Sequence, residues 1–406
     1  MGWIGLDDTD SVDGGCTTWD FHLLLSEIEE SGFEINNAPR LVRLWPFAPE
    51  RTRGNAALSA EIIVNSGNEL EFIGLIENWF NSRYLIENDW DALPHNPSLV
   101  WTINQFPEEW YWDGVRNFVD PELRMEKLNQ INGVKYWYRG SNRGVVGVTS
   151  SIAWRGLKDW TWEATAWRKQ AMIGQDRIVS NSRVREMSEK FPQTILNRDP
   201  NAGKSLITPR TPCPVLYGVR SENEIVANEA HKWLQESNDV EGAVAMRVHR
   251  TNQATDDHII KVKYGVVISE IIEVKGGHAS LSVFSGDKKY SLVAFKQGGG
   301  VNSLLRRTVI GDIVGWRGLS SSEDEIHLES LIVLDASPRF LERPICECGH
   351  RFQRQGRGQP LRCSDCGKLT NSIWKGVEFD NEGEWMEPLP SHRRHLAKPL
   401  NRQAKG

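Results

Sequence analysis

The chain has 406 residues, and at roughly 150 residues per domain this length predicts two to four compact units. Hydrophobic residues make up 39% of the composition and charged residues 25%, and every apolar run is shorter than the roughly 18 residues that span a bilayer. We therefore expect a multidomain protein that is not embedded in a membrane. The first residues, MGWIGLDDTD, are acidic where a secretory signal begins with basic ones, so we expect a cytoplasmic location.

The charge balance limits where a nucleic acid could bind. The chain has 48 Lys and Arg against 54 Asp and Glu, a formal net charge of −6. A positive potential over the whole surface is therefore excluded, and any nucleic-acid site must be local.

Residues 1–128 form the first predicted domain, with mixed α and β patterns. We expect short strands at 3–6, 40–44 and 58–64. A helix is expected over 17–31, where apolar side chains recur at helical spacing and Gly32 follows as a stop.

Residues 129–267 form the second predicted domain and alternate between strand and helix patterns. Strands are expected at 144–154, 160–167 and 212–220, and helices at 184–191 and 222–235. This order is typical of an α+β or split βαβ arrangement. From about 268 the pattern changes to short β segments only, which predicts a small barrel over 268–340.

An acidic loop between the first strand and the first helix is the strongest local signal for chemistry. Carboxylates are hard oxygen ligands that suit Mg²⁺, and glycines beside a helix N-terminus let backbone N–H groups approach a phosphate. A hydroxyl at the helix start is placed to accept or contact a phosphate. The alternative is an ordinary loop with a Thr N-cap. The residues are Asp7, Asp8, Asp10, Asp13, Gly14, Gly15, Thr17 and Thr18.

A second candidate is the loop that ends at Asn55. Arg43, Arg53, Gly54 and Asn55 combine guanidinium groups, which suit phosphate, with a tight backbone turn. Arginines in an exposed loop are also commonly solvated, so this interpretation depends on the acidic loop in the same predicted domain.

Four of the six cysteines cluster in 341–375, which predicts a structural zinc site instead of disulfides. Cys363 and Cys366 have the usual two-residue gap, whereas Cys346 and Cys348 are separated by one residue, so His350 is an alternative ligand. The segment and the tail 376–406 are also basic, which suits RNA phosphates unless both are simply solvated. The candidate RNA-binding residues are Arg351, Arg354, Arg357, Arg393, Arg394 and Lys398.

Successive blocks of the sequence resemble the archaeal isoleucine-tRNA 2-agmatinylcytidine synthetase family, TiaS, over nearly the whole chain. The blocks are GLDDTDSVDGGCTTW, PRLVRLWPFAPERTRGNAA, RGVVG, ITPRTPCPVLYGVRSE, KGGHASLSV, the cysteine segment and RRHLAKPL. The loop departs from the family pattern, because Trp45 and Phe47 replace two Asn and Ala56 replaces a Gly.

The resemblance implies an α+β multidomain fold and an ATP-dependent ligase. Its parts are a kinase-like ATP-binding α/β domain (1–128), a ferredoxin-like domain (129–267), an OB-fold β-barrel (268–340), a zinc ribbon (341–375) and the basic tail. In the implied reaction, phosphate from ATP activates the C2 carbonyl of the wobble cytidine in the CAU anticodon, agmatine replaces that oxygen, and ATP ends as AMP. The expected partners are the tRNA and agmatine, without an obligate protein partner, and the cofactors are ATP, Mg²⁺ and structural Zn²⁺.

The resemblance also implies roles for individual residues. Thr18 matches the threonine that is phosphorylated during turnover, and the aspartates of its block serve ATP and metal. Cys213, Gly218 and Arg220 lie in a block that is near agmatine in the family. This chemistry is reasonable, because a carbonyl oxygen is a poor leaving group until it is phosphorylated or adenylated.

Two other functions remain open from the residues alone. One is a single-stranded nucleic-acid binding protein with a non-catalytic N-terminal half, which would not cleave ATP in response to tRNA. The other is a small-molecule kinase or ligase, which would turn over without RNA.

Overall fold

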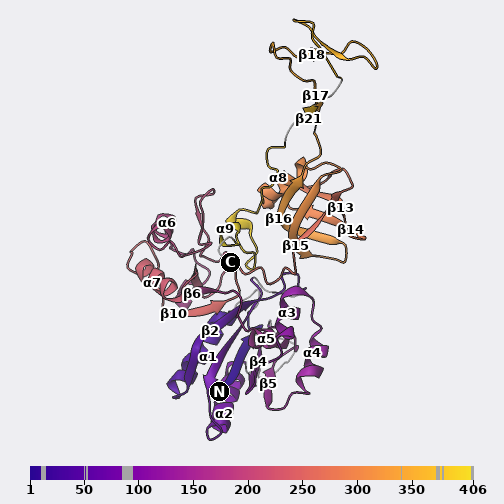
Figure 1. The fold of residues 1–406 in the computed structure, drawn as a ribbon. Coiled ribbons are helices and arrows are strands. Elements are labelled where there is room, and N and C mark those ends of the chain that lie inside the picture. The colour runs from indigo at the N-terminus through magenta and orange to yellow at the C-terminus, as the bar shows by residue number, and fades with distance from the viewer. Residues whose placement is uncertain are drawn as a thin grey trace. The chain divides into compact units, whose positions relative to one another are not determined.

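The computed structural model describes residues 1–10, 15–49, 51, 54–84, 95–339, 341–371, 375–376 and 379–403. Gly14 and Arg53 of the predicted phosphate site, and Asp13 of the acidic loop, lie outside these residues. The chain forms two compact units. The first combines Met1–Ile260 with Leu389–Gly406, and the second is Lys261–Pro388 (Figure 1).

The first unit is built on one eight-stranded sheet in the described part of the chain, with the order β5-β4-β1-β3-β2-β10-β6-β9. All neighbouring strands are antiparallel except β10 and β2, which are parallel. The strands are β1 (Gly2–Asp7), β2 (Glu34–Arg43), β3 (Ala56–Ile63), β4 (Ser98–Thr102), β5 (Val134–Tyr138), β6 (Thr161–Trp167), β9 (Val215–Ser221) and β10 (Ala245–Thr251).

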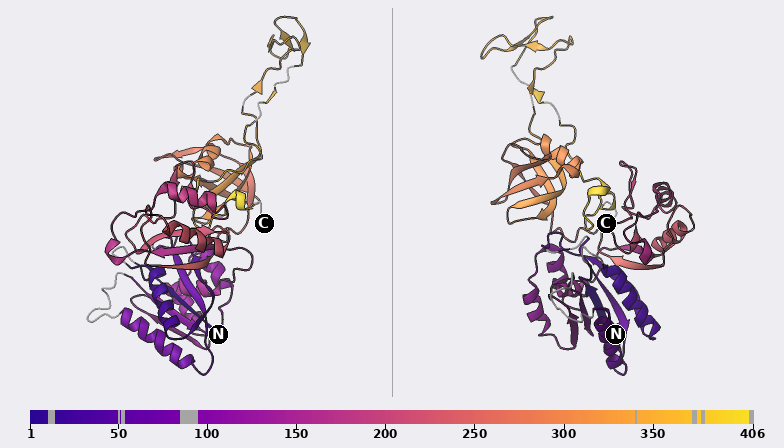
Figure 2. Two further views of the ribbon diagram at one scale, coloured as in Figure 1. Left: turned by 90° about the vertical axis from the view of Figure 1, so that its left-hand side faces the viewer. Right: turned by 180° about the vertical axis from the view of Figure 1, so that it is seen from behind.

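The first half of the sheet is covered on both faces, which follows from the alternation of side chains along its strands. Ile4 and Leu6 of β1 point into one core, with helices α1 (Thr17–Glu30) and α2 (Glu69–Arg83). Trp3 points into the opposite core, where the covering helices are α3 (Glu109–Arg116), α4 (Pro121–Leu128) and α5 (Gly144–Ala153). The helices on the two faces can be followed in Figure 2. The first strand therefore lies between two helix layers.

The second half of the sheet has its own core. Ala164 of β6 and Leu216 of β9 pack against α6 (Asn181–Lys190) and α7 (Glu224–Gln235). Both helices and both strands lie where the sequence predicts them. Parallel pairing of Arg250 with Arg40 and of Thr251 with Leu41 joins β10 to β2 and makes the sheet continuous.

The strand predicted at 144–154 is wrong, because residues 144–153 form helix α5. Nearly every residue of this helix is buried, so its sequence has no polar face, and a short apolar run does not distinguish a buried helix from a strand. Its hydroxyls are satisfied within the core, as Ser150 Oγ donates to Val146 O at 2.7 Å. Strand β5 pairs with β4, so the sheet continues across the predicted boundary at 128.

The second unit contains a closed five-stranded barrel, drawn in orange in Figure 1. Its strands follow the order β11-β15-β16-β14-β13, and pairing of β11 with β13 closes the ring. Helix α8 (Gly300–Arg307) packs on the barrel core through Leu304 and Leu305. The expectation of β segments only was therefore wrong at this helix, whose eight residues give too short a periodic signal. The barrel strands are β11 (Lys263–Val267), β13 (His278–Ser285), β14 (Lys288–Ala294), β15 (Ile313–Ser320) and β16 (Glu325–Asp335). A sixth strand, β12 (Ile272–Val274), pairs with β13 outside the closed ring.

The last described residues return to the first unit, where Figure 2 shows them in yellow beside the C label. They include the short helix α9 (Leu400–Gln403). We call residues 389–403 the C-terminal arm. Among the helices that the structure describes, none is long and apolar enough to cross a membrane.

Candidate active site

The acidic loop begins where β1 ends, at Asp7. Asp8 takes a positive φ of 58°, and its backbone N–H donates to Asp7 Oδ1 at 2.7 Å. This turn directs both carboxylates toward helix α5. A Cβ added at Gly147 would lie 1.8 Å from Asp7 Oδ2, and one at Gly144 would lie 3.0 Å from Asp8 Cβ. Glycines one turn apart on α5 therefore make the space that the aspartates occupy.

Asp7 and Asp8 of this loop have raised pKa values, so they bind protons more tightly than isolated aspartates do. Burial is the largest cause that raises the pKa of Asp7 well above its usual value, and the charges of Asp8 and Asp10 raise it further. Burial also raises the pKa of Asp8 to about 6, although Arg143, just before α5, opposes this shift. Clustered and partly desolvated carboxylates of this kind are stabilised by a bound cation. Their carboxylate oxygens are hard ligands, the type that a divalent ion such as Mg²⁺ prefers.

Thr17 and Thr18 occupy the first turn of α1, with their hydroxyls in different surroundings. Thr17 Oγ1 donates to Asp10 Oδ1 at 2.6 Å, so this side chain fixes the acidic loop. Gly15, with φ +79°, is needed before the helix because a Cβ there would lie 2.3 Å from Thr9 O. Thr18 Oγ1 lies 3.1 Å from Cys16 Sγ.

Trp167 positions the Thr18 hydroxyl from the second half of the sheet. Its indole Nε1–H donates to Thr18 Oγ1 at 3.2 Å. The indole ring stacks on the imidazole of His22, with centroids 4.6 Å apart. Burial, and then the charge of Arg247, lower the pKa of His22 to about 4, so His22 is neutral and accepts a hydrogen bond from Arg247 Nε at 3.2 Å. Sequence reasoning missed Trp167, because no local pattern distinguishes it among 17 tryptophans.

Arg43 and Arg220, which the sequence predicted separately, share one buried carboxylate. Glu163 Oε2 lies 3.8 Å from Arg43 Nη2 and 4.0 Å from Arg220 Nε. Burial acts to raise the pKa of Glu163, but the two guanidinium groups outweigh it, and the pKa lies below its usual value. Gly218 allows this approach, since a Cβ there would lie 2.5 Å from Glu163 Oε1. Glu163 was missed; the available signal was a single acid within the apolar strand pattern WTWEATAW.

The turn at Gly54 and Asn55 lies directly against Arg43. Arg43 Nη1 donates to Gly54 O at 3.1 Å, and Asn55 Nδ2 donates to Trp45 O at 2.7 Å. Phe47 of the same loop lies under the guanidinium of Arg394, 4.7 Å from the ring centroid. The two aromatic departures from the family pattern thus lie in a loop that also contacts the C-terminal arm.

Cys213 lies against Arg177. Its Sγ accepts from Arg177 Nη2 at 3.2 Å. Burial raises the pKa of Cys16 to about 12; the hydrogen bond from Thr18 lowers it, and the charge of Cys213 raises it again. Of the residues predicted near agmatine, Gly218 and Arg220 therefore lie at Glu163, whereas Cys213 lies against Arg177.

The four clustered cysteines converge in the second unit. Their Sγ atoms all lie within 4.8 Å of one another, including 3.5 Å between Cys346 and Cys366 and 3.4 Å between Cys348 and Cys363. Four thiols at this spacing fit a tetrahedral zinc ion. Because four thiols complete the set, His350 is not needed as a ligand; its Nδ1 lies 3.8 Å from Cys348 Sγ.

The predicted RNA-binding residues differ in their surroundings. Arg351, Arg354 and Arg357 are exposed beside the cysteines. Lys398, in contrast, pairs with Asp159, with 3.0 Å between Nζ and Oδ2. Lys398 therefore serves to dock the arm on its own unit, and its charge is partly neutralised there.

Comparisons with known proteins agree with this arrangement of sheet, acidic loop and cysteine cluster. Residues 3–91 match the TiaS TCKD domain and residues 142–258 match the TiaS FLD domain. The 2-agmatinylcytidine synthetase TiaS of Archaeoglobus fulgidus, whose name specifies an isoleucine tRNA, is 30% identical over 98% of this chain and 97% of its own. The enzyme of the same name from Methanopyrus kandleri is 31% identical over 98% and 96%.

Solved structures agree over the same length. A tRNA fluorescent labeling enzyme superimposes with a TM-score of 0.85 at 27% identity, covering 99% of this chain and 97% of that one. A complex of TiaS with its isoleucine tRNA and ATP gives a TM-score of 0.82 at 26% identity with the same coverage. The chain belongs to the TiaS family.

Proposed function

We propose that this protein is an ATP-dependent ligase that attaches agmatine to C2 of the wobble cytidine in the CAU-anticodon isoleucine tRNA, giving 2-agmatinylcytidine. The full-length match to TiaS enzymes supports this function, as does the likeness to a relative solved with its isoleucine tRNA and ATP. The observation that carries it is the position of Thr18 in the first turn of α1, next to Thr17, whose hydroxyl donates to Asp10 of the acidic loop. An acceptor hydroxyl beside a cation site is what phosphoryl transfer requires.

ATP binds at this loop in our proposal. Asp7, Asp8 and Asp10 would hold Mg²⁺, which neutralises charge on the phosphates of ATP. Gly15 and the first turn of α1 present backbone N–H groups to a phosphate, and Thr17 keeps Asp10 in place through its hydroxyl. Gly14 belongs to the same proposed site.

Thr18 is the proposed phosphate acceptor. Its hydroxyl accepts the indole N–H of Trp167, which leaves an oxygen lone pair for attack on a phosphorus of ATP. The new O–P bond forms as the P–O bond to the leaving part of ATP breaks, and the hydroxyl proton is released. The wobble base leaves its stack at a cost of only a few kcal/mol, because the anticodon loop is single-stranded.

Arg43 and Arg220 supply positive charge at Glu163, on the same face of β6 as Trp167. Together with Glu163 they leave one net positive charge, which favours a phosphate group over the cationic agmatine. Gly54 and Asn55 would form the adjoining turn, and Arg53 stays a proposed phosphate-binding residue. Gly218 and Cys213 remain the proposed neighbours of agmatine.

The remaining parts take the names that the family implies. The first unit would combine a kinase-like and a ferredoxin-like domain, the barrel would be an OB-fold, and the cysteine segment a zinc ribbon that holds one structural Zn²⁺. The exposed Arg351, Arg354 and Arg357 would contact tRNA phosphates, together with Arg393 and Arg394 of the arm. A tRNA-modifying enzyme of this kind works in the cytoplasm.

One assay tests the function as a whole. Purified protein is incubated with labelled agmatine, ATP and tRNA transcripts that differ at the wobble base. We expect label in the CAU transcript alone, with AMP formed in proportion. RNA binding without ATP cleavage would indicate a nucleic-acid binding protein, and turnover without RNA would indicate a small-molecule enzyme; either result would overturn the proposal.

A further inference from the structure

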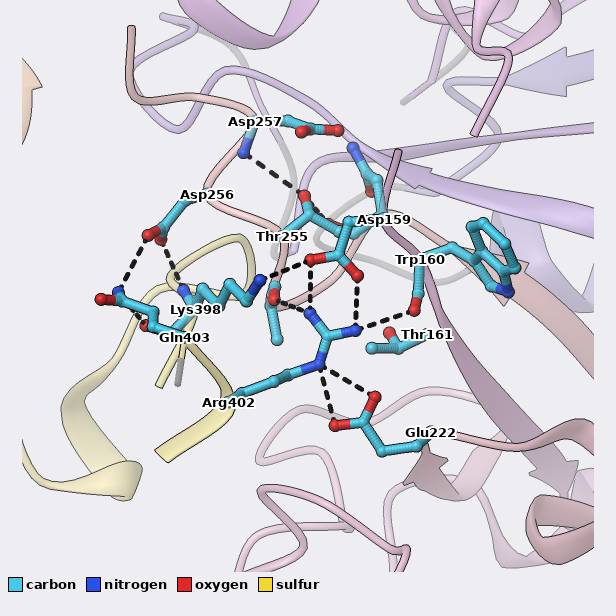
Figure 3. A network of polar contacts seen from close by, with 12 residues as sticks. Asp159, Trp160, Thr161, Glu222, Thr255, Asp256, Asp257, Lys398, Arg402 and Gln403 are labelled. Carbon is cyan, nitrogen blue, oxygen red and sulfur yellow. Dashed lines mark hydrogen bonds and ion pairs between the residues drawn. The ribbon is translucent and has the colours of Figure 1, made fainter. Parts of the chain in front are cut away.

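The C-terminal arm is bound to the first unit on both sides of His395. After it in sequence, Arg402 donates to both oxygens of Asp159 at 2.6 and 2.8 Å and to Glu222 at 2.9 and 3.0 Å (Figure 3). Before it, Ser391 Oγ donates to Asp199 Oδ2 at 2.5 Å. The arm is therefore a fixed element of the first unit.

The backbone of the arm holds His395 directly. Ala254 N–H donates to His395 O, and Asp256 N–H donates to Leu396 O, each at 2.8 Å. These two bonds resemble a short strand pairing, and they set the direction of the imidazole. Part of the His395 residue is exposed to solvent, so His395 lies at the edge of the site.

A chain of hydrogen bonds connects this imidazole to Glu163. Gln253 Nε2 donates to Glu163 Oε2 at 2.5 Å, and His395 Nδ1 lies 3.1 Å from Gln253 Oε1. A carboxylate only accepts, so the amide must present its nitrogen to Glu163 and its oxygen to His395. Nδ1 of His395 therefore carries the proton, and Nε2 keeps its lone pair.

The other end of this chain is the pair of guanidinium groups. Glu163 Oε2 is the atom nearest to both Arg43 and Arg220, and it is the same atom that Gln253 binds. On the opposite side, a Cβ at Gly54 would lie 2.3 Å from Arg43 Nη1 and 3.9 Å from His395 Nε2. His395 and Arg43 thus face the same turn.

We propose that His395 is a positioning residue of the ligation reaction: through Gln253 it fixes the Glu163 carboxylate, which in turn holds Arg220 and also holds Arg43 against the Gly54 turn where phosphate binds. The C-terminal arm is then part of the reaction centre, in addition to any contact it makes with tRNA. This inference rests on the proposed phosphate role of Arg43.

A neutral imidazole suits this role. The positive charge of Arg43 is the largest cause that lowers the pKa of His395 well below its usual value, followed by removal of the ring nitrogens from water and the charge of Arg220. A proton on Nε2 would add a third cation beside one carboxylate. His395 therefore acts as a hydrogen-bond donor at Nδ1 without adding charge to the site.

The test compares two substitutions in the full-length protein. In His395→Asn, the amide nitrogen takes the place of Nδ1 and can still donate to Gln253. In His395→Leu, the donor is lost. We expect His395→Leu to raise the KM for ATP about tenfold, the effect of about 1.4 kcal/mol, while His395→Asn stays within about threefold of the unchanged protein. Gln403→Ala, on the same arm, loses an amide nitrogen that donates to Asp256 and Lys398; it is the matched control and should keep the original KM.

A double variant makes the result decisive. If His395 acts through Gln253, then Gln253→Leu and Gln253→Leu/His395→Leu should show the same KM for ATP, because the second change removes nothing further. Additive losses, or a His395→Asn variant as impaired as His395→Leu, would overturn the positioning role. Arg43→Gln separates this outcome from the phosphate role: if Arg43→Gln leaves the KM for ATP unchanged, the proposed function of Arg43 itself is wrong.

Discussion

Asp7 at the end of β1 and Gly147 of α5 are matched in space: Asp7 Oδ2 occupies the volume that a side chain at Gly147 would fill, with 1.8 Å between Oδ2 and an added Cβ. Alanine normally stabilises a helix interior by about 1 kcal/mol relative to glycine. At Gly147 the clash should outweigh this gain and displace the carboxylate. We expect Gly147→Ala to weaken Mg²⁺-dependent ATP binding by about tenfold or more, measured by calorimetry.

Gly74 offers the matched control. It also lies inside a helix, α2, but an added Cβ there meets no atom within 4 Å. Gly74→Ala should therefore raise the free energy of unfolding by about 0.5 to 1 kcal/mol and leave ATP binding unchanged. Equal ATP affinity in the two alanine variants would contradict the proposed site.

The raised pKa of Asp8 predicts an unusual pH dependence of stability. Its folded pKa of about 6 exceeds the unfolded value of 3.8, so the folded state binds the proton more tightly. The stabilisation from that proton is complete below pH 3.8 and is lost as pH rises through about 6. Without divalent cation, we expect Asp8→Asn to be more stable than the unchanged protein at about pH 7, and the difference to shrink at about pH 5. Thermal unfolding at both pH values measures this difference.

Bound Mg²⁺ should reverse this pH dependence of stability. A cation bound to Asp8 favours the charged carboxylate, so added magnesium chloride should raise the unfolding temperature of the unchanged protein more at neutral pH than at the acidic value. Asp8→Asn should lose most of this response at both pH values. If Mg²⁺ raises the unfolding temperature of Asp8→Asn as much as that of the unchanged protein, the ion binds elsewhere.

The acidic loop could be predicted from the sequence because its signals are local. Carboxylates, glycines and threonines within one strand–loop–helix segment must lie close together whatever the rest of the fold does. Strand and helix positions along β1, α1, β9 and α7 followed for the same reason, since each shows its own periodicity. The resemblance to TiaS then indicated the family, which the comparisons confirm.

The contacts between distant segments could not be predicted. Trp167 reaches Thr18 across 149 positions, and His395 reaches Gln253 across 142; no local pattern encodes either pair. Helix α5 was mistaken for a strand because burial on all sides removes the polar face that reveals a helix. Glu163 escaped notice because its role depends on two arginines from different strands.

The cysteine cluster predicts one zinc ion per chain, held without His350. Metal analysis of the unchanged protein should find about one equivalent, and His350→Ala should retain it. Cys363→Ser removes a buried thiol of the set and should lose the metal. If His350→Ala releases zinc, the imidazole is a ligand and the four-thiol site is wrong.

The ion pairs of Arg402 with Asp159 and Glu222 predict how firmly the C-terminal arm is attached. Asp159 is only partly exposed, and although burial alone would raise its pKa, hydrogen bonds from Arg402 and Lys398 hold that pKa below the usual value. Replacing Arg402 by Met removes the guanidinium from both Asp159 and Glu222 and leaves Lys398 paired with Asp159. We expect the free energy of unfolding of Arg402→Met to fall by about 2 to 3 kcal/mol, measured by urea denaturation at neutral pH.

Arg185→Met is the matched control, because it removes an arginine from an ion pair on the surface. Arg185 and Glu189 are both exposed on α6 and pair at 3.7 Å, so Arg185→Met should change stability by no more than about 0.5 kcal/mol. The effect at Arg402 should also diminish as pH falls below about 4, since a carboxylate with a lowered pKa loses its stabilising charge only there. A loss at Arg402 no larger than at Arg185 would mean that the arm is weakly attached, and His395 would then lack the fixed backbone that its positioning role requires.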